Sequence, residues 1–205
     1  EQGALDRRAQ GVRHQGVIAE FNARQAIDEN ALITLVERAP ETPRVLILDG
    51  VQDPHNLGAC LRSALAAACC AVVVPKDRAA GLTPIARRAA AGAAEQLPLA
   101  MVTNLARCME RLQTAGLTLV GLAGESDRDL DTLDLSGPLG IVLGSEERGL
   151  RRLTRERCDG LARIAMPGPM ESLNVSVATG IALFEAVRQT RVAATRSSAT
   201  VGSHQ

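Results

Sequence analysis

The stretch that decides the fold is Met166–Arg188, "MPGPMESLNVSVATGIALFEAVR". It begins as an irregular loop, because Pro167 and Pro169 lack a backbone N–H and Gly168 bends freely. A helix follows, and its first turns consist mainly of small residues, at Ser176, Ala178, Thr179 and Gly180. Such a loop leaves backbone polar groups outside any regular ladder, and a slim helix lets another segment approach closely. The stretch therefore predicts a backbone-lined crevice beside a tightly packed helix.

Upstream of this stretch, short apolar runs alternate with helical segments from Arg44 onward. Strands are expected at 45–49, 71–75, 99–102, 117–123, 139–144 and 162–166. Almost wholly apolar strands separated by helices are typical of a parallel sheet that is covered on both faces. The chain is therefore predicted to belong to the α/β class, with helices on both faces of a parallel sheet.

The two ends of the chain differ from this regular region. Residues 1–42 hold a candidate strand at 14–22, then an amphipathic helix and a proline-bounded linker. We interpret them as the end of a preceding unit plus a connection, and the start at Glu1 rather than Met indicates that this unit is incomplete. Residues 192–205 are small and polar, which predicts a flexible tail. The main domain is thus expected to span 43–191.

Composition excludes some classes of protein and partner. Lys and Arg (23) balance Asp and Glu (23), so net charge favours neither binding nor avoidance of nucleic acid. Aromatic residues make up 1% of the chain, which argues against a base-stacking platform. Five Cys and three His follow no zinc spacing, so no metal is expected. The odd Cys count without a signal peptide favours reduced thiols in the cytoplasm, and no apolar run reaches membrane-spanning length.

Ligands of a parallel sheet bind at the carboxyl ends of its strands, and three loops there are unusual. The first is "DGVQDPHNLGACLRSA", which starts at Asp49. We expect Asn56 in the loop just before a helix and Arg62 within that helix, because six residues do not share a helix face. A capping Asn and a surface Arg are an equally good interpretation from these residues alone.

The second loop is "LGSEERGL", which starts at Leu143. Gly144 and Gly149 permit a tight turn, and Glu146 is expected at the lip of the sheet. The alternative is a plain strand–turn–helix connection with acids favoured by the helix dipole.

The third loop is the opening stretch. Its backbone groups suit a ligand with donor and acceptor edges, such as adenine. Ser172 and Asn174 could instead simply cap the helix that follows. The fingerprint glycines of dinucleotide sites, the P-loop and the serine elbow of hydrolases are all absent from the sequence.

Together the three loops resemble the three motifs of the TrmH/SpoU branch of the SPOUT methyltransferases. The motifs are Asn56–Arg62, Gly144–Glu146 with Gly149, and Ser172–Ser176, in matching order and spacing. The resemblance covers about residues 44–189. It implies an S-adenosyl-L-methionine-dependent RNA (ribose-2′-O-)-methyltransferase whose sheet ends in a deep C-terminal trefoil knot, a rare exception to unknotted topology.

The resemblance also assigns roles to individual positions. The implied catalytic residues are Asn56, Arg62, Glu146 and Asn174. The implied cofactor-binding residues are Gly144, Ile164, Met166, Ser172 and Leu173. Family members are homodimers whose pocket borders the interface, and those most similar methylate a guanosine ribose in 23S ribosomal RNA. Residues 1–42 then correspond to the end of an N-terminal RNA-binding domain plus linker, and 43–191 to the catalytic domain.

The role of Arg62 follows from its chemistry as well as from the resemblance. The arginine of the first motif is often described as the base, but a guanidinium stays protonated to roughly pH 12 or beyond. We therefore interpret Arg62 as a clamp for a neighbouring phosphate that also polarises the 2′-hydroxyl, with proton loss late in the reaction. Three other functions stay open: a tRNA ribose as substrate, a non-catalytic RNA-binding homologue, and a generic nucleotide-binding domain. Binding of S-adenosylmethionine excludes the last of these.

Overall fold

The computed structural model describes residues 2–9, 16, 24–39 and 42–201. Its centre is one six-stranded sheet in which every neighbouring pair of strands is parallel, in the order β3-β2-β1-β5-β4-β6. The strands are β1 Arg44–Asp49, β2 Ala71–Pro75, β3 Leu99–Val102, β4 Thr118–Leu122, β5 Leu139–Gly144 and β6 Gly160–Ala162. The predicted α/β class with a parallel sheet is confirmed.

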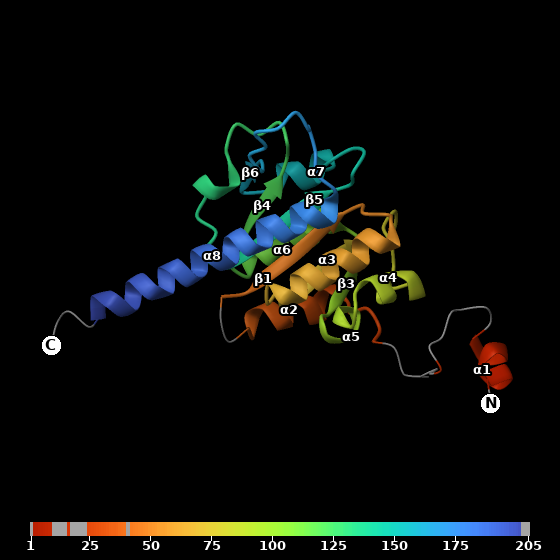
Figure 1. Cartoon of the computed structure of the whole chain (residues 1–205). Helices are drawn as coiled ribbons and strands as arrows, with labels where there is room; N and C mark the ends of the chain where they lie inside the picture. Colours follow the sequence, from red (N-terminus) through yellow and green to blue (C-terminus); the bar gives the residue numbers. More distant parts are fainter. Residues whose placement is uncertain (1, 10–15, 17–23, 40–41, 202–205) are drawn as a thin grey trace.

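Helices cover both faces of the sheet (Figure 1). One layer contains α3 Pro54–Ala66, α4 Pro84–Ala89, α5 Ala93–Gln96 and α8 Val175–Val201. The other contains α2 Glu29–Glu37, α6 Leu105–Thr114 and α7 Arg152–Glu156. In β1, Leu46 and Leu48 join the core under α3 and α8, whereas Val45 and Ile47 join the core under α2 and α6. Burial of both faces explains why the strands are almost wholly apolar.

The largest departures from the expected bounds are at α3 and at the last strand, which spans 160–162. Asp53 accepts a hydrogen bond from the backbone N–H of His55 (2.9 Å) and caps α3, so Asn56 lies in the first turn of the helix rather than in the loop. The last strand, expected at 162–166, ends at Ala162 because its only neighbour, β4, ends at Leu122. Beyond that point, the backbone of Arg163 pairs with Arg128 and Leu130 instead.

Helices α2 and α8 belong to the same body as the sheet, whereas the N-terminal helix α1 Gln2–Ala9 is drawn apart from it (Figure 1). Ile27 donates to the carbonyl of Leu99 (2.9 Å) and accepts from Met101 (3.1 Å), and the apolar face of α2 is buried at Leu32 and Val36. At the other end, α8 passes residue 192 without a break and ends at Val201. The strand expected at 14–22 lies, apart from Gly16, outside the described residues. Within those residues no helix is long and apolar enough to cross a membrane.

Candidate active site

Three polar side chains from the three predicted loops meet at the carboxyl edge of the sheet. The amide of Asn56 donates to Glu146 Oε1 (2.5 Å), and the amide of Asn174 donates to Asn56 Oδ1 (3.1 Å). Asn56 lies at the start of α3, Glu146 follows β5, and Asn174 precedes α8. Because β1 and β5 are neighbours in the sheet, the loops that follow them open at the same edge. We call Asn56, Glu146 and Asn174 the polar triad.

Asn174 has two functions at once. Its Oδ1 accepts from the backbone N–H of Ser176 (2.8 Å) and from the Ser176 hydroxyl (2.6 Å), which satisfies the first turn of α8. Its amide group remains free to donate to Asn56. The capping interpretation of Asn174 is therefore correct, and the same residue also belongs to the polar triad. Capping fixes the orientation of the amide that the triad uses.

A pocket adjoins the triad on the side of β4 and β6. Its lining includes all five predicted cofactor residues, Gly144, Ile164, Met166, Ser172 and Leu173. Glu146 also lines it, so the pocket and the triad are continuous. The end of β4 contributes Leu122, Ala123 and Gly124, which the sequence reasoning missed. Their only signal was their position at the carboxyl end of an expected strand.

The pocket suits an adenosine because its wall offers unpaired backbone groups. Within the part of the chain that the structure describes, residues 164–173 make no hydrogen bonds. Ile164 and Met166 are half-buried, and any of these backbone groups that a ligand covers needs a partner on that ligand. A base with donor and acceptor edges supplies such partners, whereas the apolar side chains of Leu122 and Leu143 provide contact area. The residues present thus fit S-adenosyl-L-methionine.

Gly144 has a second role, which is intramolecular. Ser145 and Gly149 exchange backbone hydrogen bonds (2.9 and 3.2 Å), so the loop after β5 folds back on itself. A methyl group built at Gly144 would overlap the backbone of Gly149 and Leu150. The absence of a side chain at Gly144 is therefore required by the shape of the loop that presents Glu146.

Arg62 does not join the triad within one chain. It lies six residues after Asn56 on α3, which is a rotation of about 240° around the helix. Its side chain is exposed, makes no hydrogen bond or ion pair with the described residues, and lines neither the cofactor pocket nor the hollow around Asn56. Of the nine predicted site residues, it alone stands apart.

The slim side of α8 packs against α3. Cys60 and Thr179 lie in contact, with Sγ and Oγ1 3.4 Å apart, and both are fully buried. Burial raises the pKa of the Cys60 thiol to about 11, although the hydrogen bond with Thr179 opposes this shift. The thiol beneath the triad is therefore neutral at physiological pH and is no nucleophile. Among the described residues, no cluster of His, Cys, Asp and Glu could hold a metal ion.

The family model of the SpoU rRNA methylase family matches residues 43–184. The chain therefore belongs to this family. It is 60% identical over 186 residues to the 23S rRNA (guanosine-2′-O-)-methyltransferase RlmB of Xanthomonas axonopodis pv. citri, covering 91% of this chain and 75% of that protein. It is 58% identical over 185 residues to the RlmB of Pseudomonas aeruginosa, covering 90% and 74%.

Solved structures agree with this family. The SpoU methyltransferase AviRb from Streptomyces viridochromogenes has a TM-score of 0.71 at 28% identity, covering 77% of this chain and 64% of AviRb. An AdoMet-bound rRNA methyltransferase from Sinorhizobium meliloti has a TM-score of 0.68 at 31% identity, covering 75% of this chain and 59% of that one. The chain thus spans less than two thirds of these two proteins.

Proposed function

We propose that the chain forms the catalytic part of an S-adenosyl-L-methionine-dependent methyltransferase that modifies a guanosine 2′-hydroxyl in 23S ribosomal RNA. The observation that supports this most strongly is the polar triad beside a pocket lined by all five predicted cofactor residues. The substrate assignment rests on the RlmB relatives, which are 58–60% identical to this chain.

The cofactor supplies a methyl group activated on a positively charged sulfur. We assign its adenosine to the unpaired backbone of 164–173, with Leu173 and Met166 packing beside it. Gly144 and Ile164 border the same space. Ser172 lines the pocket at the entrance to α8 and contributes a hydroxyl.

The chain's own residues align the ribose and remove its proton. The Asn56 and Asn174 amides form a fixed pair, because each is held by a further partner, Glu146 and Ser176 respectively. Such fixed donors orient the 2′-oxygen in line with the methyl group, and alignment alone can contribute several powers of ten in rate. Only one oxygen of Glu146 is engaged by Asn56, so the other is free to accept the 2′-hydroxyl proton.

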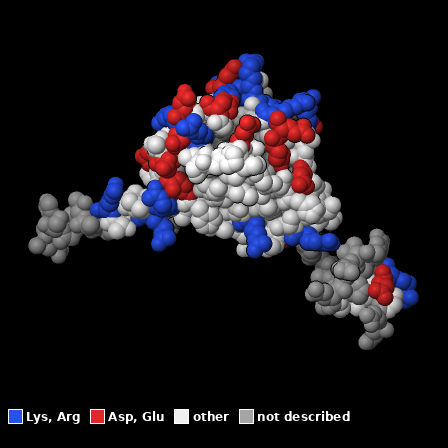
Figure 2. Space-filling model, turned by 45° about the horizontal axis from the view of Figure 1, so that its top comes forward, with Lys and Arg blue, Asp and Glu red and all other residues white. Residues whose placement is uncertain are grey.

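We further propose that the chain acts as a homodimer through the outer face of α8. Val177, Ile181 and Phe184 follow one another at helical spacing and are 50%, 41% and 49% exposed. Figure 2 shows a broad surface without charged residues between charged rims. Large apolar side chains gathered on one stripe favour a protein contact. Arg62, on the neighbouring α3, would then face the partner's site, where it clamps a phosphate of the RNA.

Sedimentation of the Ile181→Asp variant tests the dimer. A charge placed in the apolar stripe should yield monomers while the isolated fold stays intact. If the wild-type chain sediments as a monomer at micromolar concentration, the dimer proposal is wrong and Arg62 needs another role.

Three further expectations remain proposals. Residues 1–42 are assigned to the end of an RNA-binding domain plus linker, 43–191 to the catalytic domain, and 192–205 to a tail. The segment between β5 and α8 is assigned to a trefoil knot, which the insertion of β5 between β1 and β4 supports. The cytoplasm is the proposed location. A crystal structure traced from residue 139 to 190 tests the knot directly.

The function itself is tested by methyl transfer. Labelled S-adenosylmethionine should transfer its methyl group to 23S ribosomal RNA at one guanosine ribose, and mapping of the modified nucleotide should identify it. Transfer to tRNA alone would favour the tRNA alternative, and cofactor binding without transfer to either RNA would favour a non-catalytic homologue. A pH–rate profile of Glu146→Gln separates a proton acceptor from a positioning group, since only the former changes the profile's shape.

A further inference from the structure

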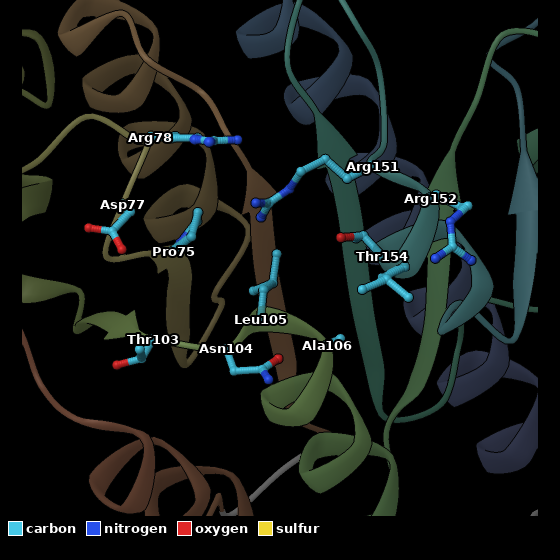
Figure 3. A pocket seen from close by; sticks show the side chains of 11 residues that line it. Pro75, Asp77, Arg78, Thr103, Asn104, Leu105, Ala106, Arg151, Arg152 and Thr154 are labelled. Carbon is cyan, nitrogen blue, oxygen red and sulfur yellow. The ribbon is translucent and has the colours of Figure 1, made fainter.

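A second hollow lies at the carboxyl edge of the sheet, and the reaction described above does not use it. It has a volume of about 730 Å³ and is formed by the end of β2, the start of α6 and the segment entering α7 (Figure 3). We call it the α6 hollow. Arg78 and Arg151 line both this hollow and the one that contains Asn56 and Glu146. A polymer seated at the polar triad can therefore continue into the α6 hollow.

The charged groups of the α6 hollow are mainly cationic. Its lining contains Arg78, Arg151 and Arg152, and Asp77 is its one carboxylate. In Figure 3 the side chains of Arg78 and Arg151 point toward one another, whereas Asp77 points away from them. Arg151 is anchored by the buried Asp49, which accepts from its backbone N–H (3.0 Å) and its Nε (2.5 Å). Arg78 makes no hydrogen bond or ion pair within the described residues.

Neutral donors complete the lining. Thr154 is only 2% exposed, and its hydroxyl, which has no hydrogen bond among the described residues, points into the hollow (Figure 3). Among the described residues the one buried side-chain atom without a partner is Arg44 Nε, so the Thr154 oxygen still reaches the open hollow and can donate to a ligand there. At the start of α6, Asn104 Oδ1 accepts from Arg107 (3.0 Å), which leaves the backbone N–H groups of Leu105 and Ala106 unpaired. These donors and the arginines suit a group that only accepts hydrogen bonds and bears negative charge.

We propose that the α6 hollow binds a backbone phosphate of the substrate RNA, close to the nucleotide whose ribose is methylated. The proposal rests on the proposed function, because it extends the path of the same RNA. The continuity of the two hollows at Arg78 and Arg151 favours a phosphodiester over free phosphate. With aromatic residues at 1% of the chain, base stacking contributes little, so phosphate contacts must position the RNA.

The test compares RNA binding by Arg78→Ala and Arg152→Ala with binding by Arg88→Ala. Arg88 is an exposed arginine on α4, outside the α6 hollow, and like Arg78 it has no ion pair within the described residues, so it is a matched control for Arg78. Arg152 differs from both because it pairs with Glu156 (2.7 Å). Each variant in the hollow should bind a 23S ribosomal RNA transcript about fivefold more weakly. Each should also reduce the slope of log affinity against log salt by about 0.7. Cofactor binding, measured by calorimetry, should stay unchanged in all three.

Thr103→Glu separates binding from folding. A carboxylate before the first turn of α6 interacts favourably with the helix dipole, so the unfolding midpoint should stay unchanged or rise. The same charge would repel a phosphate in the hollow, so RNA affinity should fall at least as far as in Arg78→Ala.

Three outcomes would overturn the inference. In the first, all variants in the hollow bind RNA as the wild type and Arg88→Ala do, while the wild type methylates RNA. In the second, Arg78→Ala abolishes binding of inorganic phosphate but leaves RNA affinity intact, which would identify a site for free anions. In the third, Thr103→Glu unfolds at the wild-type midpoint and binds RNA with wild-type affinity. A wild-type chain that binds cofactor but methylates no RNA would instead contradict the proposed function.

Discussion

The two halves of the sheet are built differently. From β1 to β3 every strand is followed by a helix, α3, α4 or α6, and Asn56 lies on the first of these helices. From β4 to β6 the connections are irregular: residues 123–138 contain only the short helix Leu130–Thr132, and residues 163–174 contain none. The cofactor pocket is lined almost wholly by this second half. Regular connections satisfy the backbone internally, whereas irregular ones leave donors and acceptors for a ligand.

Two glycine variants, one in each half of the sheet, should give the largest changes in stability and cofactor binding. A methyl group at Gly58 would overlap Ala86 and Ala89 of α4, and one at Gly144 would overlap Gly149. Each Gly→Ala substitution should reduce the free energy of unfolding by about 3 kcal/mol, because backbone must move to make room. Only Gly144→Ala should also abolish cofactor binding in the fraction that remains folded. Chemical denaturation and calorimetry measure the two effects.

Gly137→Ala serves as the control for that pair. A methyl group there meets no atom within 4 Å, so stability and cofactor binding should match the wild type. Equal loss of cofactor binding in Gly58→Ala and Gly144→Ala would contradict the assignment of the cofactor pocket to the irregular half of the sheet alone.

Asn174→Ala tests the hydrogen bond that joins the irregular half, at Asn174, to the regular half, at Asn56. Loss of its amide frees Asn56 to reorient, and kcat/KM should fall about 100-fold, the scale expected for a misaligned reacting group. Loss of the cap should cost only about 1 kcal/mol of stability. Ser176→Ala removes one bond to Asn174 Oδ1 but keeps the contact with Asn56, so most of its activity should survive. Similar activity in both variants would contradict a positioning role for the Asn174 amide.

Gln189→Ala probes how α8 holds the irregular half in place. Gln189 accepts from the backbone N–H of Leu135 (2.9 Å) and donates to the carbonyl of Leu133 (3.0 Å), both in the connection between β4 and β5. Because Leu135 is fully buried, its N–H would lose its partner, at a cost of about 2 kcal/mol. Hydrogen exchange should rise at residues 130–136 and stay unchanged in β2 and β3. Uniform exchange across the sheet would show that the two halves open together.

Glu185 gives the smallest expected effect, which depends on pH. Its hydrogen bonds with Arg188, and with Gln189 (2.9 Å), lower the pKa of the Glu185 carboxyl. A lowered pKa in the folded state stabilises the protein above the unfolded value of about 4.3, and the benefit disappears as pH falls below it. Glu185→Gln should therefore cost about 0.5 kcal/mol at pH 7 and nothing near pH 2. Denaturation at both pH values measures the difference, and an equal cost at both would exclude the ionic origin.

Sequence patterns predicted the strands that are buried on both faces more accurately than the irregular connections. The run at 71–75 matched β2 to the residue, because a strand buried on both faces is apolar throughout. The prediction of a strand at 162–166 was wrong beyond Ala162. Ile164 and Met166 are apolar because they line the cofactor pocket, and they pair with no neighbouring strand. Leu122, Ala123 and Gly124 were missed because ordinary side chains contribute to a pocket through their position alone.

The sequence by itself indicated the class of fold and the three unusual loops, and eight of the nine site residues predicted from it lie in the polar triad or line the pocket beside it. It could do so because burial, backbone freedom and hydrogen-bonding capacity are properties of individual residues. Tertiary structure alone decided that Asn56 is hydrogen-bonded to both Glu146 and Asn174. It also decided that Arg62 lies outside the polar triad and its pocket, and that Arg78 and Arg151 line two adjoining hollows. Those facts depend on the order of strands in the sheet, which brings residues 90 and 118 positions apart into contact and which no local pattern encodes.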